Sequence, residues 1–583
     1  MVAKPIVDED TLDIPIPEAS NLVLDDYRRL TGPGLLWDNT GAIFDVLFQD
    51  FDPEDVIKSW QVQVHRVLDA LNWGNQETIE RRFDGGVTLA LSAPMDQLYS
   101  AMFAGLTAWH FCAADLLGQT PGDFDAMVLD LKQVMIEEAN PALIALIDAA
   151  AKHGIDILSD DEEVSIGHGI GSQVWPVTNL PAPQDVPWHR LHDIPVAMIT
   201  GTNGKTTTTR LSAAIAKAGG KISGLTSTDF VRVGDDILDR GDYSGPGGGR
   251  MLLRDPRLEI AYLEVARGGL LQRGLPLRRA RAALVGNVAA DHLGQYGIST
   301  VEEMAEAKFA VHRTLAEDGV LVLNADDPYI VAEANHTLAT VWWYSLDPVA
   351  PQISDALANG APCAWLDNNH LMFHDGKKTS SLIHVNEIPI TMGGAARYNI
   401  LNALGAVCLS YALGLSSAAI ITGLSGFGNN PQDNPGRCNE FRVNDARVFV
   451  DFAHNPHSIS AVIEAMASIP AKRRFILLGH AGDRSDQDIL DVTQCALSLQ
   501  PDYVVAAEVP EYLRGRKLGE VTALIQTGCK EHGLRDDQVI VAQSPAQGVA
   551  EIMQRLLPED LALLLVLSER DKVFEMLEQA GTT

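Results

Sequence analysis

The sequence predicts an α/β protein built from several domains. Its 583 residues are too many for one hydrophobic core, so we expect about three or four domains. From residue 194 onward, short apolar runs typical of buried strands alternate with helical patterns, which favours mostly parallel sheets covered by helices. A loop-like stretch at 429–436 divides this alternation into two α/β domains, 193–432 and 433–583, and an α+β domain of residues 1–165 precedes both.

The N-terminal domain is expected to mix short strands with helices. Its helical segments, recognised by apolar residues at a spacing near 3.6, are 52–71, 96–117, 124–138 and 140–153. Asp52 and Asn140 are predicted N-caps, and each is followed by a proline at the first helical position. Residues 166–192 contain four prolines and are expected to connect this domain to the next.

The two later domains are predicted from short uncharged runs. Strands are expected at 194–199, 260–265, 282–288 and 320–323 in the central domain, and at 448–452, 475–479, 503–507, 539–542 and 561–567 in the last domain. Helices are expected at 209–218 and 300–313. The last domain is predicted to be a Rossmann-like, doubly wound α/β domain.

Composition excludes several classes of function. Hydrophobic residues make up 46% and charged residues 21%, as in ordinary globular proteins. The net charge of −33 argues against nucleic-acid binding; we favour a solvated acidic surface, with attraction of a cationic substrate as the alternative. Neither a leader in Met1–Leu30 nor a membrane span is expected. The six scattered cysteines indicate reduced thiols and a cytoplasmic location.

The most informative motif, TGTNGKTTT, directly follows the predicted strand 194–199. A glycine turn between a strand and a helix N-terminus points backbone N–H groups at an anion. Lys205 can reach terminal phosphates, and the Thr206 hydroxyl can bind Mg²⁺. Two residues separate Gly201 from Gly204, whereas the general nucleotide loop has four between its glycines. The predicted nucleotide-binding residues of this loop are Gly201, Thr202, Asn203, Gly204, Lys205, Thr206 and Thr207.

Two further strand ends carry polar residues. Glu264 closes the run 260–265, and we favour Mg²⁺ ligation for it over a capping or surface role. Asp291 and His292 follow the run 282–288, but histidine is an unusual Mg²⁺ ligand, so His292 by itself reads as a loop residue. Lys308 lies in the helix expected at 300–313 and by itself reads as a solvated lysine.

Together these residues resemble the Mur ligase family, the ATP-dependent amide ligases of peptidoglycan synthesis and their relatives. TGTNGKTTT matches the phosphate loop of the family, Glu264 and His292 match its magnesium ligands, and Lys308 matches a lysine that is carbamylated in many members. The further matches are GVLVLNADDP at 319–328, NILNALGA at 399–406, PGR at 435–437 and DFAHNP at 451–456. The resemblance implies a central P-loop ATPase domain followed by a ligase domain.

The resemblance also assigns roles that the spacing alone does not. Asn399 and Asn402 lie on the helix that contacts the nucleotide in the family, and Arg437 and Asp451 would reach ATP when the domains close. The metal set would be Thr206, Glu264, His292 and a carbamylated Lys308. The catalytic set would be Lys205, Lys308, His292, Asp451 and His454, in which Asp451 or His454 could position the domains or the amine and no general base is assigned.

One branch of the family is closer. Residues 241–246, 263–270, 291–294, 482–486 and 514–516 look like the Mur-like half of cyanophycin synthetase, and the similarity covers about residues 191–583. Residues 29–37 and 166–173 faintly resemble the N-terminal domain of that enzyme and the segment after it. Its ATP-grasp domain lies between these parts, whereas only residues 174–193 stand there in this chain. A single ligase site is therefore expected.

The implied function is ATP- and Mg²⁺-dependent coupling of a carboxylate to an amine through an acyl-phosphate. The substrates would be a small-molecule or peptide carboxylate and an amine, for which an amino acid is expected. No nucleic acid or membrane partner is expected, and homo-oligomer formation stays open. The alternatives are a non-catalytic ATP-binding homologue that regulates or scaffolds a partner and, less favoured, a motor or transport ATPase.

Overall fold

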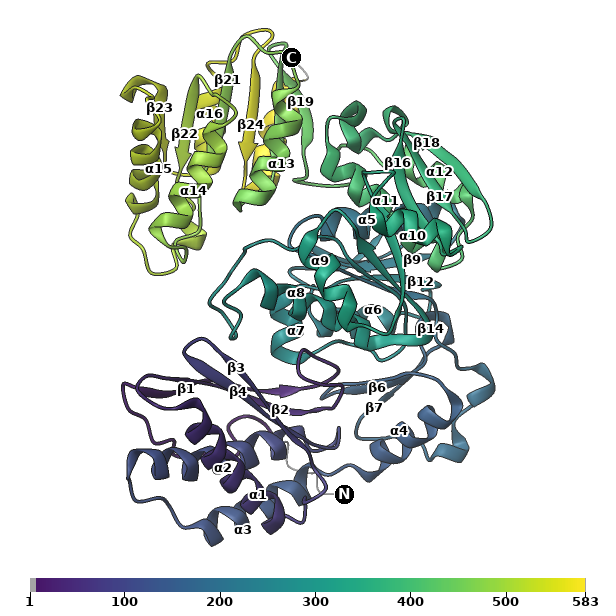
Figure 1. The fold of residues 1–583 in the computed structure, drawn as a ribbon, viewed down its shortest axis with the longest axis vertical. Helices are drawn as coiled ribbons and strands as arrows, with labels where there is room; N and C mark the ends of the chain where they lie inside the picture. Colours follow the sequence, from purple (N-terminus) through teal and green to yellow (C-terminus); the bar gives the residue numbers. More distant parts are fainter. Residues whose placement is uncertain (1–6, 582–583) are drawn as a thin grey trace. The chain divides into compact units, whose positions relative to one another are not determined.

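The computed structural model describes residues 7–581, which form two compact units. One unit contains the chain up to residue 209, residues 220–343 and residues 408–415; the other contains 210–219, 344–407 and the chain from 416 onward. Figure 1 shows the elements of each unit coloured along the chain. The expectation that Met1–Leu30 holds no leader lies partly outside the described residues.

The first unit begins with an antiparallel sheet in the order β1-β2-β4-β3, covered by helices. Both predicted N-caps are confirmed, because Asp52 accepts a hydrogen bond from the Glu54 amide and Asn140 accepts one from the Leu143 amide. Large side chains such as Phe44, Trp60 and Trp109 fill its core. The elements are β1 (Leu22–Leu30), β2 (Gly41–Phe48), α1 (Pro53–Ala70), β3 (Thr78–Phe83), β4 (Gly86–Ser92), α2 (Leu98–Leu117), α3 (Phe124–Glu138) and α4 (Pro141–His153).

A small antiparallel sheet joins this region to the central domain. Its strands are β5 (Ile157–Ser159), β6 (Glu163–Ile166) and β7 (Gln173–Pro176), and short 3₁₀ turns η1 (Gly169–Gly171), η2 (Pro183–Asp185) and η3 (Trp188–Arg190) accompany them. The stretch 166–192, expected as a connection, therefore contains a strand that pairs with β6. Its prolines lie at the end of β7 or beyond it, where they do not interrupt the pairing.

The central domain is built on a sheet in the order β11-β10-β9-β12-β8-β13-β14-β15, in which β9, β12, β8, β13 and β14 run parallel. The carboxyl ends of β8, β12 and β13 therefore meet at one edge, where Ile199 pairs with Glu264 on one side and Leu284 on the other. The elements are β8 (Val196–Thr200), α5 (Lys205–Ala218), β9 (Ser223–Thr226), β10 (Phe230–Val233), β11 (Asp236–Arg240), α6 (Pro246–Leu253), β12 (Ile260–Glu264), α7 (Arg267–Arg273), β13 (Ala280–Val285), α8 (Val301–Phe309), η4 (Ala310–Thr314), β14 (Leu315–Asn324), α9 (Pro328–Glu333), η5 (Ala334–His336) and β15 (Thr340–Ser345).

The second unit opens with antiparallel strands that the sequence analysis did not predict. They are β16 (Cys363–Asp367), β17 (His370–His374) and β18 (Thr379–His384), each paired with the next. The elements around them are α10 (Pro351–Ala358), η6 (Val385–Glu387), η7 (Pro389–Gly394), α11 (Arg397–Ala412) and α12 (Ser417–Gly426).

The C-terminal domain is the doubly wound α/β domain that the sequence predicts. Its sheet has the order β19-β20-β24-β21-β22-β23; β19 is antiparallel to β20, and the strands from β20 to β23 run parallel. The elements are β19 (Asn439–Val443), β20 (Ala446–Asp451), α13 (Pro456–Ala467), β21 (Arg474–Leu478), α14 (Asp486–Leu497), β22 (Tyr503–Ala507), η8 (Pro510–Tyr512), α15 (Glu520–Glu531), η9 (Asp536–Gln538), β23 (Val539–Ala542), α16 (Pro545–Met553), β24 (Leu561–Leu565) and α17 (Arg570–Gly581).

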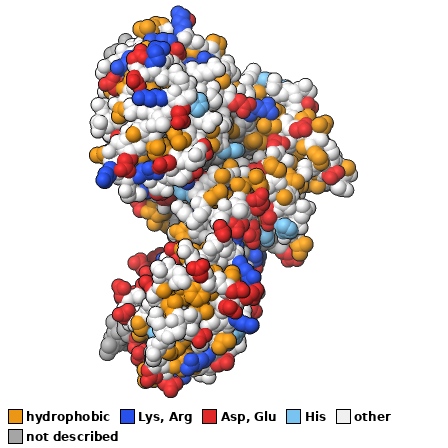
Figure 2. Space-filling view, turned by 60° about the vertical axis from the view of Figure 1, so that its left-hand side comes forward, with side chains coloured by type: hydrophobic (Ala, Val, Ile, Leu, Met, Phe, Trp, Pro, Cys, Tyr) orange, Lys and Arg blue, Asp and Glu red, His pale blue; other side chains and the backbone are white. Residues whose placement is uncertain are grey.

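One face of the molecule shows how the charged side chains are distributed. On the face drawn in Figure 2, aspartate and glutamate side chains are spread widely, with lysine and arginine side chains among them. All six cysteines are present as free thiols, as expected. Between residues 7 and 581, no helix is both long enough and apolar enough to cross a membrane.

Candidate nucleotide and metal site

The phosphate loop lies between β8 and α5, as the sequence predicts. Gly204 has a φ of 81°, a left-handed conformation that suits glycine, and the helix begins at the next residue, Lys205. The Lys205 ammonium donates hydrogen bonds to the Gly201 and Thr202 carbonyl oxygens, both at 3.0 Å. The loop thus holds one cation beside the N-terminus of α5, where backbone N–H groups and the helix dipole attract an anion.

A second segment, directly after β13, fixes the shape of this loop. Asn287 and Asn203 exchange two hydrogen bonds, each of 2.8 Å, in which each backbone group of Asn203 meets the Asn287 side chain. The Thr202 amide donates to the Asn287 carbonyl, and the Thr202 hydroxyl accepts from the Ala289 amide at 2.9 Å. Asn287 was not assigned to the site from the sequence, although a polar residue near the end of a predicted strand was the available signal.

Glu264 and Thr206 form the most specific polar contact of the site. Glu264 is the last residue of β12 and only 2% exposed, and its carboxylate accepts a hydrogen bond from the Thr206 hydroxyl at 3.1 Å. Its backbone amide also donates to the Thr226 hydroxyl, which fixes the end of the strand. A hydroxyl and a carboxylate are oxygen donors, which a hard divalent cation such as Mg²⁺ prefers.

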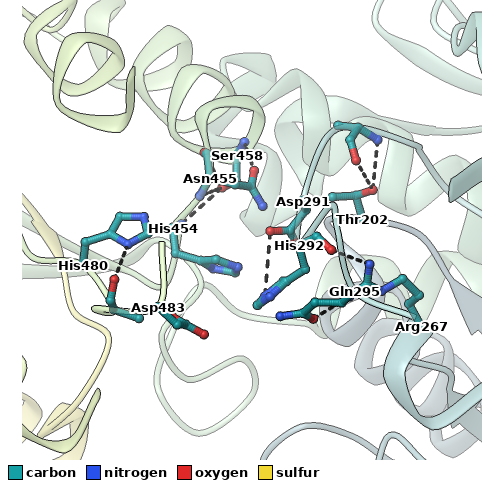
Figure 3. Close-up of polar contacts among 12 residues, drawn as sticks. Thr202, Arg267, Asp291, His292, Gln295, His454, Asn455, Ser458, His480 and Asp483 are labelled. Carbon is teal, nitrogen blue, oxygen red and sulfur yellow. Dashed lines mark hydrogen bonds and ion pairs between the residues drawn. The ribbon is translucent and has the colours of Figure 1, made fainter. Parts of the chain in front are cut away.

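His292 lies in the loop that follows β13, and Arg267 holds this loop. Figure 3 shows the Arg267 guanidinium donating to the His292 carbonyl oxygen and to the Gln295 side chain, at 2.6 Å and 2.9 Å. The His292 imidazole is about one-third exposed, and its Nε2 lies 3.9 Å from a carboxylate oxygen of Asp291. The sequence analysis did not identify Arg267 as the residue that orients this loop.

Lys308 is buried, contrary to the solvated lysine that the helical pattern alone predicted. It lies on the inner face of α8 and is 4% exposed. Burial and the neighbouring Lys205 ammonium hold the pKa of Lys308 well below its usual value, Asp291 opposes this shift, and Arg267 adds to it. The structure therefore brings Lys308, Lys205 and Asp291 into one neighbourhood at the edge of the central sheet.

The predicted metal set fits a divalent cation in its donor chemistry. Thr206 and Glu264 contribute oxygen donors that already contact one another. Within residues 7–581, no three or more His, Cys, Asp and Glu side chains are gathered closely enough to hold a metal by themselves. A metal here would therefore depend on further oxygen donors, for which a phosphate group or a carbamate on Lys308 would serve.

The NADDP sequence of the 319–328 motif has a structural role. The Asp327 carboxylate accepts from the Tyr329 and Ile330 amides and so caps α9, while its second oxygen accepts from the Val288 amide at 2.7 Å. Asn324 donates to the Gly286 carbonyl oxygen at 3.0 Å. The motif thus holds the segment after β13, which in turn carries Asn287 and the His292 loop.

In the second unit, Asn399 and Asn402 lie on the first turns of α11. The Asn399 side chain is buried and donates to the Ile390 carbonyl oxygen at 2.8 Å, and the Asn402 side chain donates to Asn399 at 3.0 Å. These bonds secure the preceding turn η7, in which Met392 adopts a left-handed φ of 54°. Nucleotide contact by the two asparagines stays a prediction.

Arg437 and Asp451 approach one another within the C-terminal domain. Asp451 ends β20 and accepts a hydrogen bond from the Ala453 amide at 2.7 Å. Burial raises the pKa of Asp451 to about 6, although the Arg437 charge and backbone N–H donors oppose the shift. The Arg437 guanidinium lies 5.1 Å from the centre of the Phe452 ring. These contacts place both residues at the carboxyl edge of the C-terminal sheet.

His454 lies at the same edge, three residues after β20. Its backbone amide donates to the Ser458 hydroxyl at 3.3 Å, and its Nδ1 lies 3.1 Å from the Phe452 carbonyl oxygen. His480, which the sequence analysis did not assign, follows β21 and is buried, so that burial lowers its pKa. The edge of the C-terminal sheet thus carries two imidazoles in addition to Asp451.

Comparison with known proteins identifies two regions of the chain. The Mur ligase middle domain matches residues 199–410, and the Mur ligase glutamate ligase domain matches residues 436–566. Cyanophycin synthetase of Trichormus variabilis is 38% identical over 58% of this chain and 37% of its own length. UDP-N-acetylmuramate–L-alanine ligase of Xanthomonas axonopodis pv. citri is 28% identical over 64% of this chain and 71% of its own length.

Among solved structures, FolC of E. coli in complex with ADP, without folate substrate, has the same fold. Its TM-score is 0.50 at 19% sequence identity, and the match covers 67% of this chain and 90% of that chain. The chain spans less than half the length of the cyanophycin synthetases that it matches.

Proposed function

Because this chain belongs to the Mur ligase family, we propose that it is an ATP-dependent carbon–nitrogen ligase that joins a carboxylate to an amine. The observation that carries the proposal is the contact between Thr206 of the phosphate loop and Glu264 at the end of β12. A phosphate-binding turn with a hydroxyl and a buried carboxylate at one sheet edge suits a nucleotide and a divalent cation.

The proposed reaction has two steps. A substrate carboxylate attacks the γ-phosphorus of ATP, so that an acyl-phosphate forms and ADP leaves. The amine then attacks the acyl carbon, phosphate leaves, and the nitrogen loses a proton as the amide forms. Because charge moves over phosphoryl oxygens in the first step and onto a carbonyl oxygen in the second, catalysis depends mainly on positioning and on fixed positive charge.

The residues of the central sheet supply these requirements. Lys205 and the N-terminus of α5 would bind the transferred phosphoryl group, for which Lys205 exchanges its two carbonyl partners for phosphate oxygens. Thr206 and Glu264 would hold Mg²⁺, with His292 as a further ligand. When bound, Mg²⁺ neutralises phosphate charge and favours in-line transfer.

We also propose that Lys308 is carbamylated. A depressed pKa increases the share of the neutral amine, which is the form that attacks CO₂. The nitrogen forms a bond to the carbon and loses a proton, so that a cation becomes an anionic oxygen donor. An anion at this position would also offset the charge of the nearby Lys205.

The C-terminal domain and α11 are assigned roles by the family resemblance. Arg437, Asn399 and Asn402 are proposed to contact ATP, and Asp451 or His454 to position the domains or the amine. The supporting observation is that Asp451 ends β20 and His454 follows it, at the carboxyl edge of a parallel sheet, where such domains bind ligands.

The substrate proposal is kept to a chemical class. We propose an amino acid or a related amine as the nucleophile, and the net charge of −33 favours a basic one by raising the local concentration of cations. The single phosphate loop, at 201–206, favours one ligation per chain rather than the two alternating ligations of a cyanophycin synthetase. Free thiols and the missing membrane helix within residues 7–581 are compatible with action in the cytoplasm.

The alternative is a non-catalytic homologue that binds ATP and regulates or scaffolds a partner. A degenerate site is expected to have lost at least one member of the set that the resemblance assigns. Here the set is complete: Lys205, Thr206, Glu264, His292, Lys308, Arg437 and Asp451. This completeness favours the ligase.

A screen of phosphate release tests the proposal. The purified chain is incubated with ATP and Mg²⁺ in a matrix of amino acids and small carboxylic acids. A ligase releases one phosphate per amide, and only when both an acid and an amine are present. Titration with a fluorescent ATP analogue should give one site per chain. Nucleotide binding without any acid- and amine-dependent release would favour the alternative, and a polymer formed from free aspartate and arginine would refute the single ligation.

A further inference from the structure

The loop that carries His292 has an unusual backbone. Within residues 292–297, four residues have φ in the left-handed region: His292 at 51°, Gly294 at 87°, Tyr296 at 56° and Gly297 at 64°. Glycine adopts this region readily, but a histidine and a tyrosine do so at a cost in conformational energy. Such a backbone persists only where the surroundings determine it strongly, so the contacts of this loop decide where His292 stands.

Part of the support comes from the central domain itself. Arg267 donates to the His292 carbonyl oxygen and to Gln295, and the Gln272 side chain contacts the Tyr296 hydroxyl. The Gly294 amide donates to the Ile298 carbonyl oxygen at 2.7 Å, which closes the turn. These bonds hold the start of the loop and its apex from the α7 side.

The rest of the support comes from the N-terminal sheet. Arg81 of β3 donates to the Gly297 carbonyl oxygen at 2.8 Å, and the Phe83 ring lies so close to Gly297 that a Cβ there would stand 2.5 Å from it. The Arg28 guanidinium of β1 lies 5.6 Å from the centre of the Tyr296 ring and donates to the Leu271 carbonyl oxygen at 3.1 Å. Two left-handed residues are thus held by a different domain from the one that contains them.

Strand alternation explains why these side chains face the loop. Side chains two apart in a strand share a face, so Arg81 and Phe83 point the same way and Arg82 points the other way. Arg82 instead forms an ion pair with Glu54 of α1. Arg81 is opposite Thr88 of β4, and Thr88 is opposite Asp45 of β2, so these residues form a polar row across the sheet.

This polar row is itself fixed by buried contacts. The Thr88 hydroxyl donates to Asp45 at 2.7 Å, and Arg28 donates to the other Asp45 oxygen at 2.6 Å. Asp45 is 2% exposed, so its charge is compensated by groups of its own sheet. Arg28 and its partners therefore form a rigid support rather than a set of mobile surface side chains.

Arg81 also reaches the helix that carries Lys308. Its guanidinium lies 3.4 Å from a carboxylate oxygen of Glu303 and 3.6 Å from one of Glu306, both on α8, and only 13% of its side chain is exposed. One guanidinium thus contacts the end of the His292 loop and the outer face of α8. Lys308 lies on the inner face of that helix.

We infer that Arg81 is a positioning residue of the metal site. From the N-terminal sheet, it fixes the position of the His292 loop relative to α8. The inference rests on the proposed function in that it takes His292 and Lys308 as groups of the metal site. It gives the N-terminal domain a role in the central site in addition to any substrate contact, because loss of Arg81 would let the loop leave its left-handed conformation.

The first test is hydrogen–deuterium exchange of the nucleotide-free protein. Arg81→Gln is expected to raise exchange at least about tenfold in peptides that cover 289–298, because the Gly297 bond and two ion pairs are lost together. Arg82→Gln, on the same strand but directed to α1, is the matched control and should leave these peptides unchanged. If Arg81→Gln does not fold, Arg81→Lys is tested instead. It is expected to give an intermediate increase in exchange, because the lysine ammonium can replace only part of the hydrogen bonding of the guanidinium.

The second test separates positioning from general destabilisation. Affinity for a fluorescent ATP analogue is measured with Mg²⁺ and with EDTA. In Arg81→Gln, the factor by which Mg²⁺ raises the affinity should be about five- to twentyfold smaller than in the parent, while the affinity in EDTA should change little. Equal losses in both conditions, or loop exchange equal to that of Arg82→Gln, would overturn the inference. A parent protein that binds no nucleotide would refute the proposed function instead, while the exchange experiment would still decide whether Arg81 holds the loop.

Discussion

Two sheets of this molecule each place a buried carboxylate at the end of a parallel strand. Glu264 closes β12 of the central sheet and is 2% exposed, and Asp451 closes β20 of the C-terminal sheet and is 6% exposed. Most of the other residues of both strands are apolar, with Arg447 as the charged exception in β20. In both domains the carboxyl edge is where a doubly wound fold binds ligands. The fold thus gives both carboxylates the same location.

Their partners differ. Glu264 meets the Thr206 hydroxyl in the first turn of α5, beside a loop that binds anions. Asp451 is surrounded by backbone N–H donors and by the Arg437 charge, and its pKa is still raised to about 6. At the first edge, a carboxylate and a hydroxyl face one another, and their oxygens are suitable ligands for a cation. At the second edge, the carboxylate has its hydrogen-bond donors and a positive charge within its own domain.

The chemistry of such an edge is set by the loop next to it rather than by the sheet. The central sheet has a glycine turn and a helix that begins with Lys205, whereas α13 of the C-terminal sheet begins with Asn455 as cap and Pro456. The N-terminus of α5 is available to bind a phosphate, whereas the N-terminal amides of α13 are capped by a side chain of the chain itself. Substitutions at the two edges should therefore have different consequences.

Removal of the Lys205 charge should have the largest effect. Lys205→Ala keeps the backbone of the loop but leaves the phosphate charge uncompensated, so ATP-dependent amide formation should fall at least about 10³-fold. Lys217→Ala, on the last turn of the same helix, is the control and should retain activity. Unchanged turnover in Lys205→Ala, measured as phosphate release, would remove the nucleotide site from the central sheet.

The next largest effect is expected at Glu264. Glu264→Gln retains the shape and can still accept the Thr206 hydrogen bond, but it removes the negative charge, so the Mg²⁺ concentration for half-maximal activity should rise about 10- to 100-fold. The control is Glu259→Gln. Glu259 precedes the other end of β12 and forms an ion pair with Lys221, so this variant should not alter the Mg²⁺ dependence. Equal Mg²⁺ curves for the two variants would contradict the metal role.

Sequence patterns predicted the parts of this fold that depend on local rules. The caps at Asp52 and Asn140, the phosphate loop and the strands β8, β12, β13, β14 and β20 to β24 were predicted, because each follows from a few neighbouring residues. The strands β16, β17 and β18 were missed, and so were β9, β10, β11, β15 and β19. Each has only four to six residues and mixed polarity, so neither a long apolar run nor a helical spacing marks it.

The parts that sequence could not predict are set by contacts between distant segments. Lys308 lies in an amphipathic helix whose pattern does not show which neighbours cover it, and its burial follows from packing at the edge of the central sheet. The hydrogen bonds between Asn287 and Asn203 require β13 to lie beside β8, which is a property of the strand order. Arg81 can be recognised as a support of residue 297 only after the N-terminal sheet is placed.

Lys308 gives a prediction of similar size that is more specific. Lys308→Ala should lower activity about 10- to 100-fold and should recover part of it in the presence of a short-chain carboxylate, which can enter the vacated volume as an anionic donor. Lys205→Ala, tested with the same carboxylate, should not recover, because it has lost a cation. Full activity of Lys308→Ala without additive would rule out the carbamate, and the result would weaken the contrast between the two edges.

The last prediction concerns Asp451, and it is an effect of pH on stability rather than on activity. Because the folded pKa of about 6 exceeds the ordinary 3.8, the folded protein holds this proton more tightly than the unfolded chain does, so the contribution of Asp451 to stability falls as pH rises from 4 to 6. Asp451→Asn removes the titration while Oδ1 can still accept from the Ala453 amide. Relative to the parent, this variant should gain up to about 3 kcal/mol in its free energy of unfolding over that interval. Urea unfolding at pH 4, 5, 6 and 7 measures the difference, with Asp536→Asn as the exposed control. A difference that does not change with pH would mean that the pKa of Asp451 is the same in the folded and the unfolded state, and the two edges would then be more alike than their partners indicate.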